Sequence, residues 1–156
     1  MSEQSAYHGN LDCEESGMGQ EAKKVVFYDG DCGLCANVVR FCFHRDRRNQ
    51  LWYTSLESEF SEKNRVRLKL PSPGADADTF VFWQADLKRC DDRSEAACQL
   101  GLALGGIWAV LARISLIVPR KLRDYGYDLI AQNRHRFFRG KSECLLSPEL
   151  QKRFLK

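Results

Sequence analysis

The pattern of apolar residues on either side of a close pair of cysteines constrains the fold most. The run from Lys24 to Tyr28 is continuous, apolar and β-branched and stops at Asp29-Gly30, which is typical of a strand buried on both faces. From Cys32 to Arg48 the apolar residues follow helical spacing, and basic residues occupy the last turn. A buried strand that leads directly into a helix favours an α/β fold.

The rest of the chain continues to alternate between the two periods. The further predicted strands are 51–56, 79–83 and 87–90, the last two joined by the hairpin link 84–86. The further predicted helices are 57–69, 94–104, 107–118 and 121–138. The order β-α-β-α-β-β-α, followed by two more helices, predicts an α/β domain with a thioredoxin-like core and a helical C-terminal extension.

Charge is distributed unevenly over the 156 residues. Residues 1–22 hold five acidic residues and no Lys or Arg, and they lack periodicity, which predicts a disordered acidic tail. We assign 23–148 to one domain and 149–156 to a basic tail. The net charge of +3 is too small to indicate a nucleic-acid partner, and the pattern does not indicate an oligomeric state.

Two features bear on the compartment. Residues 1–21 contain no basic n-region and no apolar h-region, so we expect no secretory signal and a cytoplasmic location. The apolar segment 101–118 contains Arg113 and three glycines, so we expect a buried or docking helix and no membrane span.

The seven cysteines are odd in number and irregular in spacing, which argues against a disulfide framework. In a reducing compartment a close cysteine pair indicates catalysis, redox sensing or metal binding.

The candidate chemistry lies in Cys32 and Cys35, where the buried strand passes into the helix. A thiolate at a helix N-terminus is stabilised by unpaired backbone N–H groups and by the helix dipole. We therefore predict that Cys32 touches water and attacks disulfides. Cys35 lies one turn on and shares its face with apolar residues, so we expect it to be buried, to have the higher pKa and to resolve the mixed disulfide.

Several neighbouring residues are candidates for supporting roles. Asp31 is expected to cap the helix and also to oppose a Cys32 thiolate, while Asp29 and Gly30 shape the turn. Asp29 is an alternative proton relay to Cys35. Cys42 lies about 10 Å along the helix axis from Cys35, too far for a bridge, and is predicted to be a small core residue. Cys90 and Cys98 are interpreted as structural.

The motif Asp29-Gly30-Asp31-Cys32-Gly33-Leu34-Cys35, preceded by Val25-Val26-Phe27-Tyr28, resembles the DCC family of predicted thiol-disulfide oxidoreductases. The resemblance continues over about 24–148, through the Arg-rich segment that starts at Arg134, and reaches Cys144. It implies a thioredoxin-like fold with dithiol chemistry, in which Cys144 is a third redox partner or ligand, or a spectator thiol. Arg134 belongs to a basic and aromatic cluster, 134–139, that could grip an acidic partner or form a solvated face.

The sequence departs from ordinary thioredoxins in two places. Leu34 stands where thioredoxins have a proline between the cysteines, and Asp78-Thr79 replaces the proline that precedes their third strand. That proline presents the substrate and keeps metals off the dithiol, so its absence leaves room for metal binding.

We therefore predict a thiol-disulfide oxidoreductase that needs no cofactor and acts on a protein or low-molecular-weight disulfide. Two alternatives remain open at this point. A metal-binding module would need more ligands than one Cys-x-x-Cys provides. A non-catalytic interaction domain would use the helices after Ile107.

Overall fold

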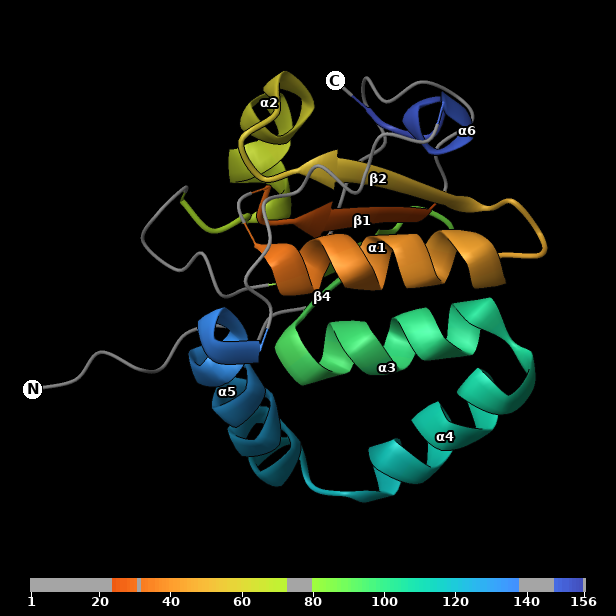
Figure 1. The fold of residues 1–156 in the computed structure, drawn as a ribbon, viewed down its shortest axis with the longest axis vertical. Helices are drawn as coiled ribbons and strands as arrows, with labels where there is room; N and C mark the ends of the chain where they lie inside the picture. Colours follow the sequence, from red (N-terminus) through yellow and green to blue (C-terminus); the bar gives the residue numbers. More distant parts are fainter. Residues whose placement is uncertain (1–23, 31, 73–79, 138–147, 156) are drawn as a thin grey trace, which may run out of the picture.

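The computed structural model describes residues 24–30, 32–72, 80–137 and 148–155, without the side chains of 134–137. Figure 1 shows helices on both sides of a central sheet. The strands are β1 (Lys24–Tyr28), β2 (Leu51–Ser55), β3 (Val81–Gln84) and β4 (Arg89–Asp92). The helices in these ranges are α1 (Gly33–Arg45), α2 (Glu59–Leu68), α3 (Arg93–Leu104), α4 (Gly106–Ile117), α5 (Arg120–Phe137) and α6 (Pro148–Gln151). The predicted α/β class is confirmed.

The sheet is mixed, with the strand order β2-β1-β3-β4. β1 pairs with β2 in parallel and with β3 antiparallel, and β4 extends the sheet antiparallel to β3. The parallel pair needs a crossover, which α1 supplies. The predicted buried strand is confirmed, because Val25, Val26 and Phe27 are fully buried in the central β1.

Two apolar cores lie on opposite faces of the sheet, since neighbouring strand residues point to opposite sides. Val26 and Phe82 face α1 and α3, which contribute Val39 and Leu100. Val25, Phe27 and Trp83 belong to the other cluster, together with Leu68 of α2. The face that carries α1 and α3 also carries the candidate site, so the site is built directly on one of the two cores.

The structure differs from the sequence prediction at the hairpin. The fourth strand was expected at 87–90 but begins at Arg89, because Ala85–Lys88 form a four-residue turn rather than a shorter link. Lys88 has a left-handed backbone with φ of 48°, which closes the turn and delays the strand by two residues. Arg89 then pairs with Gln84, and Cys90 pairs with Trp83.

The C-terminal segment, expected to be only a basic tail at 149–156, is attached to the edge of the sheet over residues 148–155. Leu150 of α6 is buried in the core, and Phe154 bridges in parallel to Tyr53 of β2. The Tyr53 N–H donates to the Arg153 carbonyl, and the Leu155 N–H donates to the Tyr53 carbonyl, both at 2.9 Å. These bonds cover the exposed backbone of an edge strand.

Helix α5 is joined to α3 and β4 by polar side chains. Arg123 pairs with Glu95 at 2.9 Å, Arg120 pairs with Asp92 at 2.7 Å, and the Ser94 hydroxyl donates to Asp124. These contacts lie near the start of α3, and they hold α5 beside that end of α3 (Figure 1).

Helices α4 and α5 carry many exposed apolar side chains. Ile107, Ile114 and Ile117 of α4 are more than half exposed, as are Leu122 and Tyr125 of α5. The break between α3 and α4 falls at Gly105 and Gly106, both with positive φ, so the apolar segment from 101 to 118 is two helices. None of the helices described here has the length and apolar character that crossing a membrane requires.

Candidate active site at the start of helix α1

Cys32 lies at the start of α1, as the strand-to-helix pattern predicted, but it is itself the N-cap, a position that had been expected for Asp31. Its backbone is extended, with φ of −91° and ψ of 110°, and its carbonyl accepts the first helical hydrogen bond, from Ala36. Its sulfur accepts a hydrogen bond from the Cys35 N–H at 3.3 Å. The sulfur therefore takes the place that a Ser or Asp oxygen takes at other helix starts, and this favours its thiolate form.

The expected difference in exposure between the two cysteines is wrong. Cys32 is only 3% exposed, whereas Cys35 is half-buried. The capping hydrogen bond turns the Cys32 sulfur back toward the helix, which the sequence-based placement at the helix tip did not take into account. Cys32 is shielded from bulk solvent, but it lines the cavity that is described below.

The pKa of Cys35 is shifted in the direction expected from the sequence. The hydrogen bond to Cys32, burial and the nearby Cys32 charge all raise the pKa of Cys35 well above its ordinary value. The charge of Asp29 raises this pKa further, although a backbone hydrogen bond at Asp29 opposes the shift. The Cys35 thiol therefore keeps its proton at neutral pH.

The turn before α1 is tightly fitted. Asp29 is buried, and its carbonyl accepts a hydrogen bond from the Cys32 N–H at 3.2 Å. A Cβ on Gly30 would lie 3.1 Å from the Ser55 hydroxyl oxygen at the end of β2. A side chain at position 30 would therefore require the Ser55 hydroxyl to move by a few tenths of an ångström. Asp29 and Gly30 are brought to the cysteines as expected.

Three other predicted site residues cannot be placed against the dithiol. Asp31 and Cys144 lie outside the described residues, and of Arg134 only the backbone, within α5, is described. The side chains of the basic cluster 134–139 also lie outside the described part of the structure.

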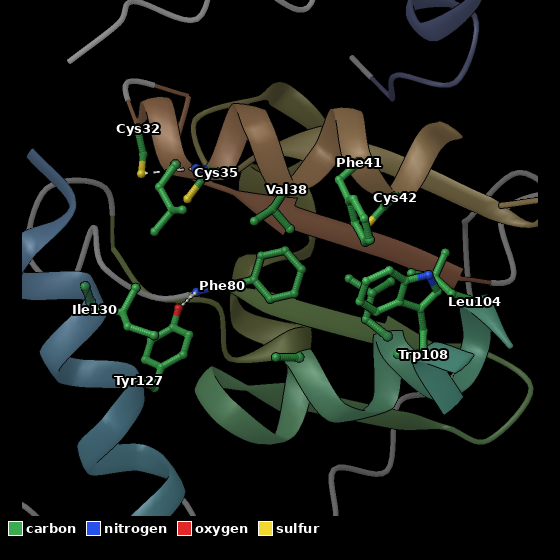
Figure 2. Close-up of a pocket in the computed structure, with 15 residues that line it drawn as sticks. Cys32, Cys35, Val38, Phe41, Cys42, Phe80, Leu104, Trp108, Tyr127 and Ile130 are labelled. Carbon is green, nitrogen blue, oxygen red and sulfur yellow. Dashed lines mark hydrogen bonds between the residues drawn. The ribbon is translucent and has the colours of Figure 1, made fainter. Parts of the chain in front are cut away.

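An apolar cavity of about 300 Å³ opens beside the two cysteines. Figure 2 shows their sulfurs at one end and Trp108 of α4 at the other, with Val38 and Phe80 between them. The cavity lies among α1, α3, α4 and α5. Its lining is made up of Cys32, Leu34, Cys35, Val38, Phe41, Cys42, Phe80, Ala97, Leu100, Gly101, Leu104, Trp108, Tyr127, Ile130 and Ala131.

Aromatic contacts close the end of this cavity that is far from the dithiol. The rings of Phe41 and Trp108 meet edge to face, with centroids 4.8 Å apart. The Arg45 guanidinium lies over both rings, 5.4 Å and 5.6 Å from their centroids. These contacts join α4 to α1.

Tyr127 of α5 forms part of the wall nearer the dithiol. Its hydroxyl accepts a hydrogen bond from the Phe80 N–H at 3.1 Å (Figure 2). Burial raises the pKa of Tyr127 to about 12, and the Cys35 and Cys32 charges add to that shift. Tyr127 and the two cysteines thus line the same cavity. The sequence gave no sign of the cavity, because four separate helices are needed to enclose it.

The remaining described cysteines occupy structural positions. Cys42 is 2% exposed within the core, so its prediction as a core residue is confirmed, and burial followed by the charge of Asp46 raises its pKa to about 12. Cys98 is buried against Arg123, 3.2 Å from a guanidinium nitrogen, and Cys90 contacts the Leu68 carbonyl. Across the described ranges no three His, Cys, Asp or Glu side chains converge as metal ligands would.

Comparison with known proteins gives matches at the level of sequence. Residues 26–140 match the model of the DCC1-like thiol-disulfide oxidoreductase family. The uncharacterized protein YuxK of Bacillus subtilis is 35% identical over 137 residues, 87% of this chain and 96% of that protein. A chloroplastic DCC family protein of Arabidopsis thaliana is 28% identical over 134 residues, 85% of this chain and 76% of that protein. No solved structure matches.

Proposed function

Because the chain belongs to the DCC1-like thiol-disulfide oxidoreductase family, we propose that it exchanges thiols and disulfides with Cys32 as nucleophile and Cys35 as resolving thiol. The observation that carries the proposal is the capping hydrogen bond from the Cys35 N–H to the Cys32 sulfur. It puts the sulfur at the positive end of α1 and within one turn of a second thiol.

The exchange takes two steps. The Cys32 thiolate attacks one sulfur of the substrate disulfide, a Cys32–substrate disulfide forms, and the other half of the substrate leaves as a thiolate. Cys35 then attacks the Cys32 sulfur, which releases the second half and leaves a Cys32–Cys35 disulfide. The substrate gains two electrons, the two cysteines lose them, and their protons go to the released thiolates.

The second step depends on a change at Cys35. The hydrogen bond to Cys32 is the largest cause of the raised pKa of Cys35, and the Cys32 charge adds to it. Both disappear when Cys32 is held in a mixed disulfide. The pKa of Cys35 then falls, and the resolving thiol becomes reactive only after Cys32 has attacked. The buried carboxylate of Asp29, whose charge acts on Cys35, is the candidate proton acceptor.

We propose a thioredoxin-like scaffold for this chemistry. Its support is the strand order β2-β1-β3-β4 with one parallel and two antiparallel pairs, and the dithiol at the junction of β1 and α1. In this scaffold the hairpin partner β3 and helix α3 lie beside the helix that carries the dithiol.

The decisive experiment compares two single variants with the native protein. Cys32→Ser should abolish reduction of a model disulfide, whereas Cys35→Ser should accumulate a mixed disulfide on Cys32 that mass spectrometry detects. Failure to form a Cys32–Cys35 bridge in any redox buffer would overturn the proposal. In the native protein the reduction potential of the Cys32–Cys35 couple indicates the direction of electron flow. A potential of about −270 mV would indicate a reductant, and a potential of about −120 mV would indicate an oxidant.

One observation favours an interaction role as a second candidate. Apolar side chains of α4 and α5 are exposed over a wide area, with Ile117 at 82%. If binding through these helices is the whole function, the Cys32→Ser/Cys35→Ser double variant keeps full function in cells that lack the native protein. Loss of function in that variant favours the redox proposal.

A further inference from the structure

The cavity beside the dithiol constrains what can reach the reactive sulfur. We infer that its ligand is a low-molecular-weight disulfide with an apolar alkyl or aromatic group, which occupies the cavity while its sulfur meets Cys32. The inference rests on the proposed function and names its substrate class. Four observations support it: the position of the two sulfurs beside the cavity, the apolar lining of the cavity, the volume of the cavity and the burial of Cys32.

The first two observations concern chemistry. Cys32 and Cys35 both line the cavity, so a molecule inside it is next to the dithiol (Figure 2). The rest of the lining is made of aliphatic and aromatic side chains, such as Val38, Leu100 and Trp108. Among the described residues that line the cavity there is no Asp, Glu, Lys or Arg. A charged tripeptide such as glutathione would lose its hydration against these residues without a partner for its charges.

Size and access favour a small molecule over a protein. The cavity volume of about 300 Å³ lies at the lower end of the range for small-molecule sites, roughly 300–1,000 Å³. At about 30 Å³ per water-sized group, it holds on the order of ten non-hydrogen atoms. Since Cys32 is only 3% exposed, a substrate sulfur reaches it by entering the cavity. A disulfide held in a folded protein is too bulky for that path.

The step balances as an ordinary exchange. The Cys32 thiolate attacks the sulfur that carries the apolar group R, an S–S bond to R forms, and the leaving half departs as a thiolate with the electron pair of the broken S–S bond. The group R then lies along the cavity, toward Trp108, until Cys35 displaces it as RS⁻.

A homologous series of alkyl methanethiosulfonates tests the inference. These reagents transfer an S-alkyl group to a thiolate and release methanesulfinate. With the Cys35→Ser variant, the rate of modification of the Cys32 peptide is followed by mass spectrometry from methyl to octyl and divided by the rate of a free thiol. We expect a rise of about fourfold per methylene, the equivalent of about 0.8 kcal/mol, until the cavity is full. A flat or falling series overturns the inference.

Two variants that fill the cavity from different helices provide the second measurement. Ala97→Phe acts from an exposed position on α3, and Ile130→Trp acts from an exposed position on α5. Both should slow the long reagents at least about tenfold, while the methyl reagent keeps its rate within about twofold. Val66→Phe, on the exposed surface of α2, is the matched control and should leave the whole series unchanged. Equal slowing of all reagents would indicate a blocked entrance and overturn the inference.

The outcomes separate this inference from the proposed function. If Cys32 reacts with the methyl reagent and native protein forms the Cys32–Cys35 bridge, but chain length has no effect, only the substrate class is wrong. If neither the reaction nor the bridge occurs, the redox function itself fails. Faster reaction with a protein disulfide than with a dialkyl disulfide of matched leaving group also overturns the substrate class.

Discussion

The two walls of the dithiol cavity are held in place by different forces. On the α1 wall, Ala36, Val39 and Cys42 are at most 3% exposed and pack against the sheet. On the α5 wall, Ala131 is buried, but Leu129 and Ile130 are more than half exposed, and ion pairs attach the helix to α3 and β4. The α1 wall depends on apolar burial and the α5 wall on charge.

The α1 wall carries the two cysteines of the dithiol, whereas the α5 wall contributes to the shape of the cavity. Apolar burial responds little to salt or pH, so the geometry of Cys32 and Cys35 is kept over a wide range of conditions. Ion pairs at partly exposed positions weaken with salt and with protonation of their acids. The α5 wall is therefore the adjustable part of the cavity, and each of the following experiments tests that division.

The largest expected effect contrasts two thiols on the α1 wall. Cys32 caps the helix, whereas burial and the Asp46 charge raise the pKa of Cys42 to about 12. At pH 7.5 only about one Cys42 in 10⁴ to 10⁵ is a thiolate. We expect iodoacetamide to label Cys32 at least about 10³ times faster than Cys42, as measured by peptide mass spectrometry. Similar rates for both would contradict the assignment of the N-terminal end of α1 as the reactive end.

The second contrast is in stability. Val39 is fully buried under α1, so Val39→Ala removes two methylene equivalents and leaves a void. We expect it to lower the free energy of unfolding by about 2–3 kcal/mol in urea titration. The matched truncation on the other wall is Ile130→Ala, at a side chain 60% exposed, and it should cost less than about 0.5 kcal/mol. Equal costs would mean that the α5 wall is packed as firmly as the α1 wall.

The fold was predictable in the segments where the apolar residues follow a single period, either that of a strand or that of a helix. The apolar run at 24–28 and the helical spacing after it identify β1 and α1, and the elements from β2 to α5 keep their predicted type. The fourth strand was displaced because a lysine adopts a left-handed turn conformation, and no glycine or asparagine marks that turn. The docking of Phe154 on β2 was missed because a single bridge leaves no periodic signal.

Of the candidate site, only the pair of cysteines was predictable from the sequence. The spacing of Cys32 and Cys35 and their place after a buried strand are local features, and they identify the dithiol. The burial of Cys32 depends on where its sulfur turns, and the cavity depends on Trp108 and Tyr127 from distant segments. Such long-range packing cannot be read from spacing along the chain.

The third experiment tests the charged attachment of α5. Burial alone would raise the pKa of Glu95, but hydrogen bonds from Gln99 and Arg123 and the charges of Arg123 and Arg89 lower it overall. A lowered folded-state pKa adds stability above the ordinary value of about 4.5, and that stability is lost as pH falls through the folded-state pKa. We expect Glu95→Gln to lower the free energy of unfolding by about 1–2 kcal/mol at pH 7.

The pH and salt dependence of this variant distinguish a charge effect from a packing effect. The difference from the native protein should shrink as pH falls below about 4.5 and should also shrink in high salt. Glu59→Gln is the control, because Glu59 forms an exposed pair with Lys63 on α2 and should leave the stability at pH 7 unchanged within error. A Glu95→Gln difference that stays constant from pH 7 to pH 3 would mean that packing, and not charge, attaches α5.

The smallest expected effect concerns the hydrogen bond from the Phe80 N–H, directly before β3, to the Tyr127 hydroxyl of α5. Tyr127→Phe removes the acceptor of the Phe80 N–H and should cost about 1 kcal/mol. Because burial and the cysteine charges hold the pKa of Tyr127 at about 12, its hydroxyl stays protonated, and the cost should be the same from pH 6 to pH 9. Thermal or urea unfolding at both pH values measures it. A cost that grows with pH would show that Tyr127 ionises beside the dithiol, and the α5 wall would then contribute a charge to the chemistry as well as a shape.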